Sequence, residues 1–414
     1  MGAGLGQVAA ISTEAVKVMT AEFSPPENWL IEQLRFDRTS RAARAASLAL
    51  PSSLDWNQVI ATAQWHGLAG LLLASDTADA MPAEARAQLE EIAFETRTCN
   101  AAHRLGLEEW LNRFDAAGIP TIILKGIAVT ALVYGRSSLR WMQDVDVLVR
   151  REDFGRAGEL LRAAGFSPCR ELGGATEPTL RTQTHWINPT PPGGALDLHW
   201  HLIDSGYYAH HVPIEWFWDH TVSVPFLGRE MRVLAPEAQL LHLTAHLELH
   251  HASVSLLALY DIAALIHKFS SAMDWELVLN TAARFEWGQS LRRTVQRAET
   301  LFGVSLPNGV AARLEKLPPT WHERLARVLA TPAAHPAVFL FDGWEQPGVR
   351  GKVRYWWRSL FPSAEFMQER DAGWRQGGPV PRYLLRLARG MYRIPRALFS
   401  GVAQLLHPAE AKRG

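Results

Sequence analysis

Apolar residues recur at intervals of three and four along two stretches of the chain, residues 29–118 and 236–330. This period predicts helices. In the first stretch, "SLDWNQVIATAQWHGLAGLLLAS" opens with a Ser/Asp cap. Residues 81–120 predict one long helix that ends at Gly118 and Pro120. The second stretch contains "PEAQLLHLTAHLELHH" and "SLLALYDIAALIHKF". The pattern therefore predicts two helical regions, with a segment of different character between them.

The segment between them alternates short strands with helices. "TIILK" and "DVDVLV" are β-rich runs, and each is followed by a helical pattern, "GIAVTALVYG" and "REDFGRAGELLRAAGF". "THWIN" and "ALDLHWHL" predict further strands, separated by the turn "PTPPGG". We therefore predict an α+β fold, in which a small mixed-sheet core is flanked by N-terminal and C-terminal helical regions.

The pattern divides the chain into five parts. They are a loose leader (1–25), a helical N-terminal region (26–117), an α/β core (118–235), a second helical region (236–330) and a basic, Trp/Arg-rich C-terminal region (331–414).

Composition indicates a folded protein, with 42 basic and 42 acidic residues and 48% hydrophobic residues. The longest apolar run, "LAGLLLA", is too short to cross a bilayer, and the N-terminus has no secretory pattern. Cys99 and Cys169 provide neither a disulfide framework nor a thiolate metal site. These features lead us to expect a cytoplasmic protein without a transmembrane segment.

The balanced charge conceals a basic C-terminus. From Arg350 onward there are 13 Lys/Arg and 4 Asp/Glu. Five arginines are spaced by four, three, four and three residues, and would form one helical stripe, although Gly390 and Pro395 weaken that helix; they are Arg382, Arg386, Arg389, Arg393 and Arg396. The stripe is either a solvated face that pairs with the acidic body or the contact for an anionic partner, such as a phosphate-rich molecule or a membrane surface. No recognisable nucleic-acid-binding module accompanies it.

Two aspartates begin the strand "DVDVLV". Asp144 and Asp146 point to the same side, because successive side chains on a strand alternate faces. Neighbouring carboxylates repel each other unless a cation compensates, and their hard oxygen atoms suit Mg²⁺. Asp197, in "ALDLHW", supplies a third carboxylate if the two strands are neighbours. Three carboxylates can hold two metal ions, one that activates an attacking oxygen and one that stabilises a leaving pyrophosphate.

A Lys-Gly turn precedes these aspartates. Lys125 ends a strand, and Gly126 lets the backbone approach a ligand closely before a helix begins. An ammonium group beside a helix N-terminus is typical of a phosphate site. Arg136 and Arg140, on the loop that leads to the aspartates, are candidates for the outer phosphates of a nucleotide.

This arrangement resembles the nucleotidyltransferase fold of the DNA polymerase beta superfamily. More narrowly, "LKG…YG…LR…QDVDVLV" followed by "LDLHWHL" is similar to a bacterial family of uncharacterised nucleotidyltransferases, some of which neighbour lasso-peptide and other peptide-maturation genes. The resemblance implies that Asp144, Asp146 and Asp197 are catalytic metal ligands and that Gly126 is the phosphate-turn glycine, with Lys125 beside it.

The chain departs from the superfamily at this turn. The usual Gly-Ser or Gly-Gly is here Gly126-Ile127, and Ser137 or Ser138 is the candidate replacement for the missing hydroxyl.

Histidines near the aspartates are candidates for acceptor contacts. His199 and His201 share a strand face with Asp197, so each is either a general base or a partner of that carboxylate. His242, His246 and His250 recur every four residues along one helical face, and we select His246 as an acceptor contact. A metal site and ordinary packing remain the alternatives for this face.

We therefore expect a metal-dependent enzyme that transfers a nucleoside monophosphate from a nucleoside triphosphate, ATP first among them, to an acceptor and releases pyrophosphate. We expect two Mg²⁺ ions, with Mn²⁺ as an alternative. The acceptor is a peptide or a small-molecule hydroxyl or phosphate. The alternatives are an inactive scaffold with the same fold and a tRNA-modifying enzyme. A sugar transferase with an Asp-x-Asp motif fits less well, because there the apolar strand precedes the aspartates, whereas here "VLV" follows them.

Overall fold

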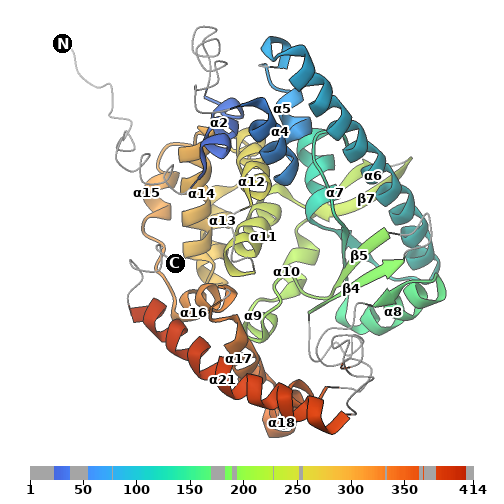
Figure 1. Ribbon diagram of the computed structural model, residues 1–414, viewed down its shortest axis with the longest axis vertical. Helices are drawn as coiled ribbons and strands as arrows, with labels where there is room; N and C mark the ends of the chain where they lie inside the picture. Colours follow the sequence, from blue (N-terminus) through green and yellow to red (C-terminus); the bar gives the residue numbers. More distant parts are fainter. Residues whose placement is uncertain are drawn as a thin grey trace.

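The computed structural model describes residues 23–37, 55–76, 78–168, 182–188, 194–226, 228–250, 255–331, 333–362, 367 and 379–406. The predicted leader up to residue 22, Cys169 and residues 189–193 of the predicted turn lie outside the described residues, as does the side chain of Arg382. Figure 1 shows a sheet on one side of the molecule and a group of helices on the other, with the last helix along one end.

Seven strands form one mixed sheet in the order β3-β4-β5-β2-β1-β7-β6. Two pairs, β2 with β5 and β1 with β7, are parallel, and the others are antiparallel. The strands are β1 (Thr121–Ile123), β2 (Val145–Val149), β3 (Ser167–Pro168), β4 (Gln183–Asn188), β5 (Gly194–His199), β6 (Thr221–Phe226) and β7 (Arg229–Leu234). The predicted mixed sheet is confirmed. It also contains the hairpin β6–β7, whose strands the sequence pattern does not predict.

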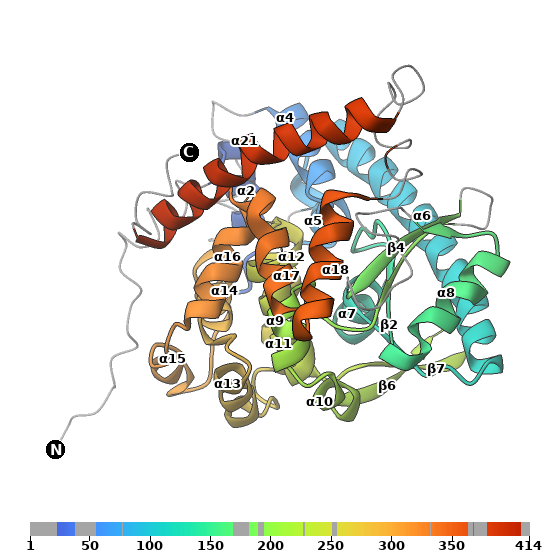
Figure 2. The ribbon, with the colours of Figure 1, turned by 90° about the horizontal axis from the view of Figure 1, so that it is seen from below.

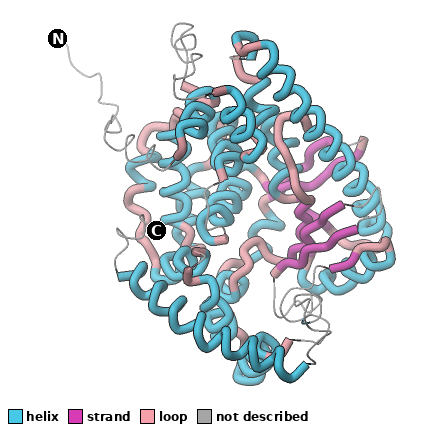
Figure 3. Tube along the Cα trace, viewed as in Figure 1, coloured by secondary structure: helices cyan, strands magenta, loops and turns pink. Residues whose placement is uncertain are grey.

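The two faces of the sheet are buried against different helices. Val145 and Val147 belong to the core formed with α6 (Ala83–Ala116) and α8 (Phe154–Ala163). Ile122 and Leu148 point the other way and join the core of the helical body. Figure 3 shows the strands enclosed between helices on both sides. Because side chains alternate along β2, Asp146 shares the side of Leu148, which faces the helical body.

The helical body is formed by helices that precede the strands in the sequence together with helices that follow them. Its helices are α2 (Pro25–Gln33), α4 (Trp56–Trp65), α5 (Ala69–Leu73), α11 (Pro236–Leu249), α12 (Leu256–Phe269), α13 (Trp275–Arg284), α14 (Gly288–Phe302), α15 (Val310–Leu314) and α16 (Trp321–Ala330). The predicted Asp cap is present, since the Asp55 side chain accepts a hydrogen bond from the Gln58 amide. The single long helix predicted before Gly118 is α6.

Further elements complete the described part of the chain. They are the 3₁₀ turns η1 (Ala78–Ala80), η3 (Arg151–Asp153) and η4 (His335–Ala337), and the helices α9 (Gly206–His211), α10 (Ile214–Asp219), α17 (Val338–Glu345), α18 (Gly348–Leu360) and α21 (Pro379–Leu406). The predicted helix "GIAVTALVYG" is α7 (Lys125–Val129), which continues as the π-helical turn η2 (Thr130–Tyr134). Among the described helices, none combines the length and apolar character that crossing a bilayer requires.

One buried asparagine holds the loop that leads to the aspartates. The Asn100 side-chain amide, on α6, donates to the carbonyl oxygens of Ser137 (2.6 Å) and Arg140 (2.7 Å). Its oxygen accepts from the Met142 amide at 3.2 Å. A Cβ on Gly70 would lie 2.2 Å from the Ser138 carbonyl oxygen, so the loop also packs closely on α5. These contacts fix the backbone just before β2.

We expect Asn100→Ala to lower the free energy of unfolding by about 2–3 kcal/mol, because three backbone groups, one of them buried, lose their partner. Urea unfolding followed by circular dichroism measures this change. Glu95→Ala, at an exposed position of the same helix, is the control and should change stability by less than about 0.5 kcal/mol. Equal midpoints for the two variants would contradict the assigned role of Asn100.

Candidate active site

Asp146 is a buried carboxylate with two cationic or hydrogen-bonding neighbours. Its Oδ1 lies 2.7 Å from the Lys125 Nζ and 3.0 Å from the His199 Nε2. Asp146 is only 4% exposed and His199 only 1%. A buried carboxylate is stable only when it is paired and hydrogen-bonded, and these two side chains provide both.

The parallel pairing of β2 with β5 brings the third aspartate to the same place. Asp146 and Asp197 are direct register partners across the two strands. On the next strand His185 is the register partner of Asp197, and its Nδ1 forms a close contact with the Asp197 Oδ1. The three aspartates Asp144, Asp146 and Asp197, here called the acidic cluster, therefore converge on one face of the sheet.

The donor atoms form two groups that share Asp197. One group is Asp144, His185 and Asp197, and the other is Asp146, Asp197 and His199. In each group one ligand atom per residue lies within 4.8 Å of the others. Oxygen and imidazole donors at this spacing suit a divalent cation.

The pKa values of Asp144 and Asp146 shift in opposite directions, because the two carboxylates have different neighbours. Burial, together with the charges of Asp146 and Asp197, raises the pKa of Asp144 to about 6. Burial also acts to raise the pKa of Asp146, but the Lys125 ammonium and the His199 hydrogen bond outweigh it and hold that pKa below its usual range. The acidic cluster thus has one firmly ionised member and one that is protonated in mildly acidic solution.

The Lys-Gly turn has an unusual backbone. Lys125 has φ +42°, a left-handed conformation that is costly for a residue with a side chain. A Cβ on Gly126 would lie 2.8 Å from Nη1 of Arg140, so the glycine makes room for this guanidinium. No side chain caps the helix α7 that begins here. The turn directs the Lys125 ammonium to the acidic cluster.

Arg140 belongs to a buried network that joins the turn to the helical body. Its Nε donates to Asp261 of α12 at 2.8 Å, and Asp261 also accepts from the Tyr134 hydroxyl at 2.7 Å. Its Nη1 donates to the Trp141 carbonyl oxygen at 3.1 Å. The predicted phosphate contact therefore lies beside the turn, with its charge already matched by Asp261.

Three other predicted site residues, His201, His246 and Ser138, have contacts with neighbouring parts of the fold. His201 is buried and hydrogen-bonds the Val212 carbonyl oxygen and the Ile203 amide, and burial lowers its pKa to about 4. His246 stacks on His250, with ring centroids 4.8 Å apart. Ser138 contributes its backbone to the packing on Gly70. His201 and Ser138 therefore contact neighbouring backbone, as residues that support the fold do.

The sequence pattern does not single out His185, His242 or Asp261 as site residues. Asp261 had a readable signal, because a lone carboxylate inside the apolar run "LLALYDIAALI" requires a buried partner. The sequence places His242 on one helical face with His246 and His250, and His246 is the predicted acceptor contact on that face. In the described structure neither ring nitrogen of His242 has a hydrogen-bond partner, and its pKa is lowered by burial and by nearby Lys125 and His199. The contact of His185 with Asp197 follows from the register between β4 and β5, which the sequence pattern does not determine.

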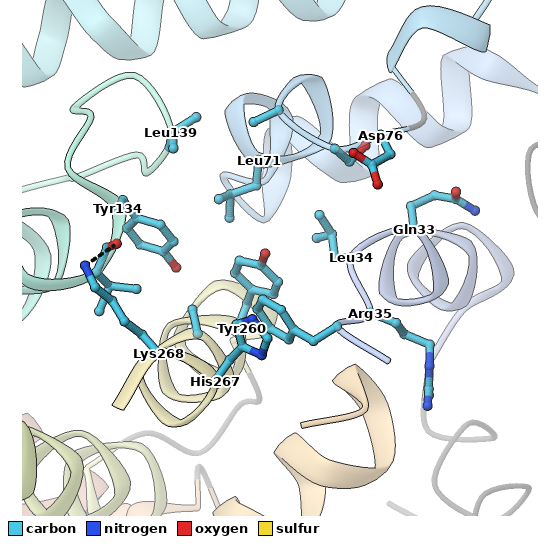
Figure 4. Close-up of a pocket in the computed structure, with 15 residues that line it drawn as sticks. Gln33, Leu34, Arg35, Leu71, Asp76, Tyr134, Leu139, Tyr260, His267 and Lys268 are labelled. Atoms are coloured by element: carbon cyan, nitrogen blue, oxygen red, sulfur yellow. Dashed lines mark hydrogen bonds between the residues drawn. The ribbon is translucent and has the colours of Figure 1, made fainter. Parts of the chain in front are cut away.

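A separate cavity of about 580 Å³ lies between α2, α5, α12 and η2. Figure 4 shows Tyr134, Tyr260 and His267 among the residues that line it. Phe36 also lines the cavity and stacks on His267, with ring centroids 4.3 Å apart. None of the three aspartates lines it, but Tyr134 does, and the same residue bonds Asp261. The cavity is therefore adjacent to the network behind the turn and distinct from the acidic cluster.

Comparisons with known proteins give one family. Residues 52–303, more than half of the 414-residue chain, match a protein family described as "Uncharacterised nucleotidyltransferase". Among solved structures, an antigenic nucleotidyltransferase-like protein from Paracoccidioides brasiliensis aligns with 14% identity and a TM-score of 0.32, covering 51% of this chain and 95% of that chain. The comparison with curated proteins found no match.

We expect opposite effects on stability from substitutions of Asp144 and Asp146. In chelator at pH 8, Asp144→Asn should raise the free energy of unfolding by about 1–2 kcal/mol, because it removes a half-buried charge and the repulsion from its two neighbours. Asp146→Asn should lower it by about 3 kcal/mol, because Lys125 loses its buried partner. Urea unfolding measures both, with the exposed Asp79→Asn as control.

The pH dependence separates the two aspartates further. The folded pKa of Asp144 lies above its ordinary value of 3.8, so the folded protein binds the extra proton below about pH 6, and the repulsion appears as pH rises through that window. The advantage of Asp144→Asn should therefore shrink between pH 8 and pH 5. The cost of Asp146→Asn should persist at pH 5, since its carboxylate is still ionised there. An advantage of Asp144→Asn that is equal at both pH values would contradict the charge assignment.

Proposed function

The chain belongs to the uncharacterised nucleotidyltransferase family, and from this membership and the acidic cluster we propose that it transfers a nucleoside monophosphate from a nucleoside triphosphate to an acceptor. In this reaction an acceptor oxygen bonds to the α-phosphorus, the bond to the β-phosphate oxygen breaks, and pyrophosphate leaves. ATP is the first candidate donor. The observation that supports the proposal most directly is the convergence of three aspartates on one sheet face beside a lysine.

The donor set fits divalent cations. Three carboxylates and two imidazoles surround one region, and burial together with the charges of Asp146 and Asp197 raises the pKa of Asp144. Asp144, Asp146 and Asp197 would hold the ions, Mg²⁺ first and Mn²⁺ as an alternative, with His185 and His199 within reach. Bound cations would supply charge neutralisation at the phosphates and lower the pKa of the attacking oxygen.

The residues of this chain would contribute mainly positioning and charge. Lys125 neutralises Asp146, and its ammonium would also attract the negatively charged triphosphate. The His199 contact orients the Asp146 carboxylate, and His185 orients that of Asp197. Little covalent chemistry by the protein is required, as is usual for phosphoryl transfer.

The altered turn favours a second candidate, a binding protein that retains the fold without turnover. Ile127 replaces the hydroxyl residue usual in the superfamily, and Arg140 is already paired with Asp261. Calorimetry with ATP and Mg²⁺ distinguishes a protein that binds nothing from one that binds nucleotide. Measured binding without label transfer would favour the second candidate.

We expect wild-type protein to transfer label from one α-labelled nucleotide, with Mg²⁺ present, to an acceptor in cell extract. Asp144→Asn, Asp146→Asn and Asp197→Asn should each lower the rate at least about 10³-fold, because each removes a charge that the transition state requires. Asp79→Asn, an exposed carboxylate on η1, should retain full activity. Electrophoresis of the labelled product would also identify a peptide, nucleic-acid or small-molecule acceptor.

Transfer that survives Asp144→Asn would overturn the proposed site. Loss of transfer counts for the site only in variants that still unfold cooperatively, so the urea measurement described for Asp144→Asn and Asp146→Asn is made for Asp197→Asn as well.

A further inference from the structure

The helices α18 and α21 carry basic residues without any acidic ones. There are four Lys/Arg in α18 and five in α21, and neither helix contains Asp or Glu. Figure 2 shows both helices on the same side of the molecule, across the helical body. They are joined by contacts near their ends, where the Tyr383 hydroxyl donates to the Pro362 carbonyl oxygen at 2.5 Å and Arg386 donates to the Ser359 carbonyl oxygen at 2.9 Å.

α21 packs on the body through a narrow face of small residues. Ala397 is only 1% exposed, and a Cβ on Gly401 would lie 3.5 Å from Val328 of α16. The Thr331 hydroxyl lies 3.5 Å from the Gln404 side-chain oxygen on the same face. Despite Pro395 in its interior, the helix runs for 28 residues, about 42 Å at the usual rise.

A second face of α21 is apolar and lies in solvent. Its large side chains are 52% to 78% exposed and are spaced by seven, eight, three and four residues; they are Leu384, Met391, Phe399, Val402 and Leu406, here called the apolar stripe. α18 adds three exposed apolar side chains at intervals of four, Val349, Val353 and Trp357. Apolar side chains grouped to this extent on a surface indicate an interaction site.

At about 100° per residue, the exposed part of the arginine stripe lies on one flank of α21, and Leu385 and Tyr392, which are 40% and 64% exposed, lie between it and the apolar stripe. Arg389, Arg393 and Arg396 are exposed. Within the part of the chain that the structure describes, no carboxylate pairs with Arg389 or Arg393, so the predicted pairing with an acidic body is not present at these two residues. The Arg396 guanidinium donates to the Tyr392 hydroxyl at 2.8 Å.

We propose that α18 and α21 form a docking surface for an anionic phospholipid bilayer, with α21 lying in the plane of the interface. In that position the apolar stripe enters the boundary of the acyl chains while the arginines reach the lipid phosphates. A nucleic acid would leave the apolar stripe in water. A second copy of the chain would bring the arginine stripes of two protomers together, and like charges repel. The bilayer accommodates both stripes at once.

Vesicle flotation tests the proposal with the full chain. Wild-type protein should float with vesicles of phosphatidylcholine and phosphatidylglycerol at 3:1, and should remain unbound with phosphatidylcholine alone. The bound fraction should fall as salt rises from about 50 to 500 mM, because screening weakens the arginine contacts.

Two double variants separate the contributions of the stripes. Arg389→Gln/Arg393→Gln should reduce partitioning onto the anionic vesicles by at least about tenfold. Met391→Asp/Phe399→Asp should abolish flotation, since it places charge where acyl contact is required. Arg97→Gln/Arg284→Gln, which removes the same charge from exposed positions on α6 and α13, should bind like wild type.

Several outcomes would overturn the proposal. They are equal binding to neutral and anionic vesicles, no binding to either, and binding unchanged by both stripe variants. Capture of RNA at physiological salt without vesicle binding would assign the surface to a nucleic acid instead. Light scattering that shows a dimer broken by Met391→Asp/Phe399→Asp, with no vesicle binding, would assign it to a second copy.

Discussion

The structure depends on how negative charge is tolerated on one face of the sheet. Three carboxylates meet where β2 and β5 run side by side, and main-chain pairing fixes their separation. Lys125 and His199 compensate one of them, and His185 contacts another. Burial and the two neighbouring carboxylates raise the pKa of Asp144, so its ionised form carries a free-energy cost in the folded protein. A divalent cation placed among these carboxylates would lower that cost.

The surrounding helices maintain this arrangement from the side that faces the body. α11 supplies His242 near the lysine and the carboxylates, and α12 supplies the aspartate that holds Arg140 against Gly126. The loop before β2 is fixed in turn by Asn100 on α6. The site is therefore built from the sheet together with helices on both sides of it, and family similarity extends over the same region, residues 52–303.

Much of the fold could be predicted from the sequence because its signals are local. The long helix α6, the β-rich run of β2 and the Asp cap at Asp55 depend on residues close in the chain. The same holds for the alternation that puts Asp144 and Asp146 on one face. By contrast, His185 reaches Asp197 only through a register between β4 and β5 that the sequence pattern leaves open. The close approach of Arg140 to Gly126, fourteen residues earlier in the chain, is likewise absent from the sequence pattern. Contacts of that kind arise from packing, which a periodic pattern does not encode.

The pairing of Arg140 with Asp261 also limits how the chain can be shortened. The two residues lie on opposite sides of residue 235, so a fragment that stops after β7 would contain a buried guanidinium without its counter-charge and would lose the helices that cover one sheet face. The smallest independently folding piece should therefore extend at least through α12, and α14, which packs on α11 and α12, belongs with it. For this protein the autonomous unit is larger than the strand-containing segment that carries its chemistry.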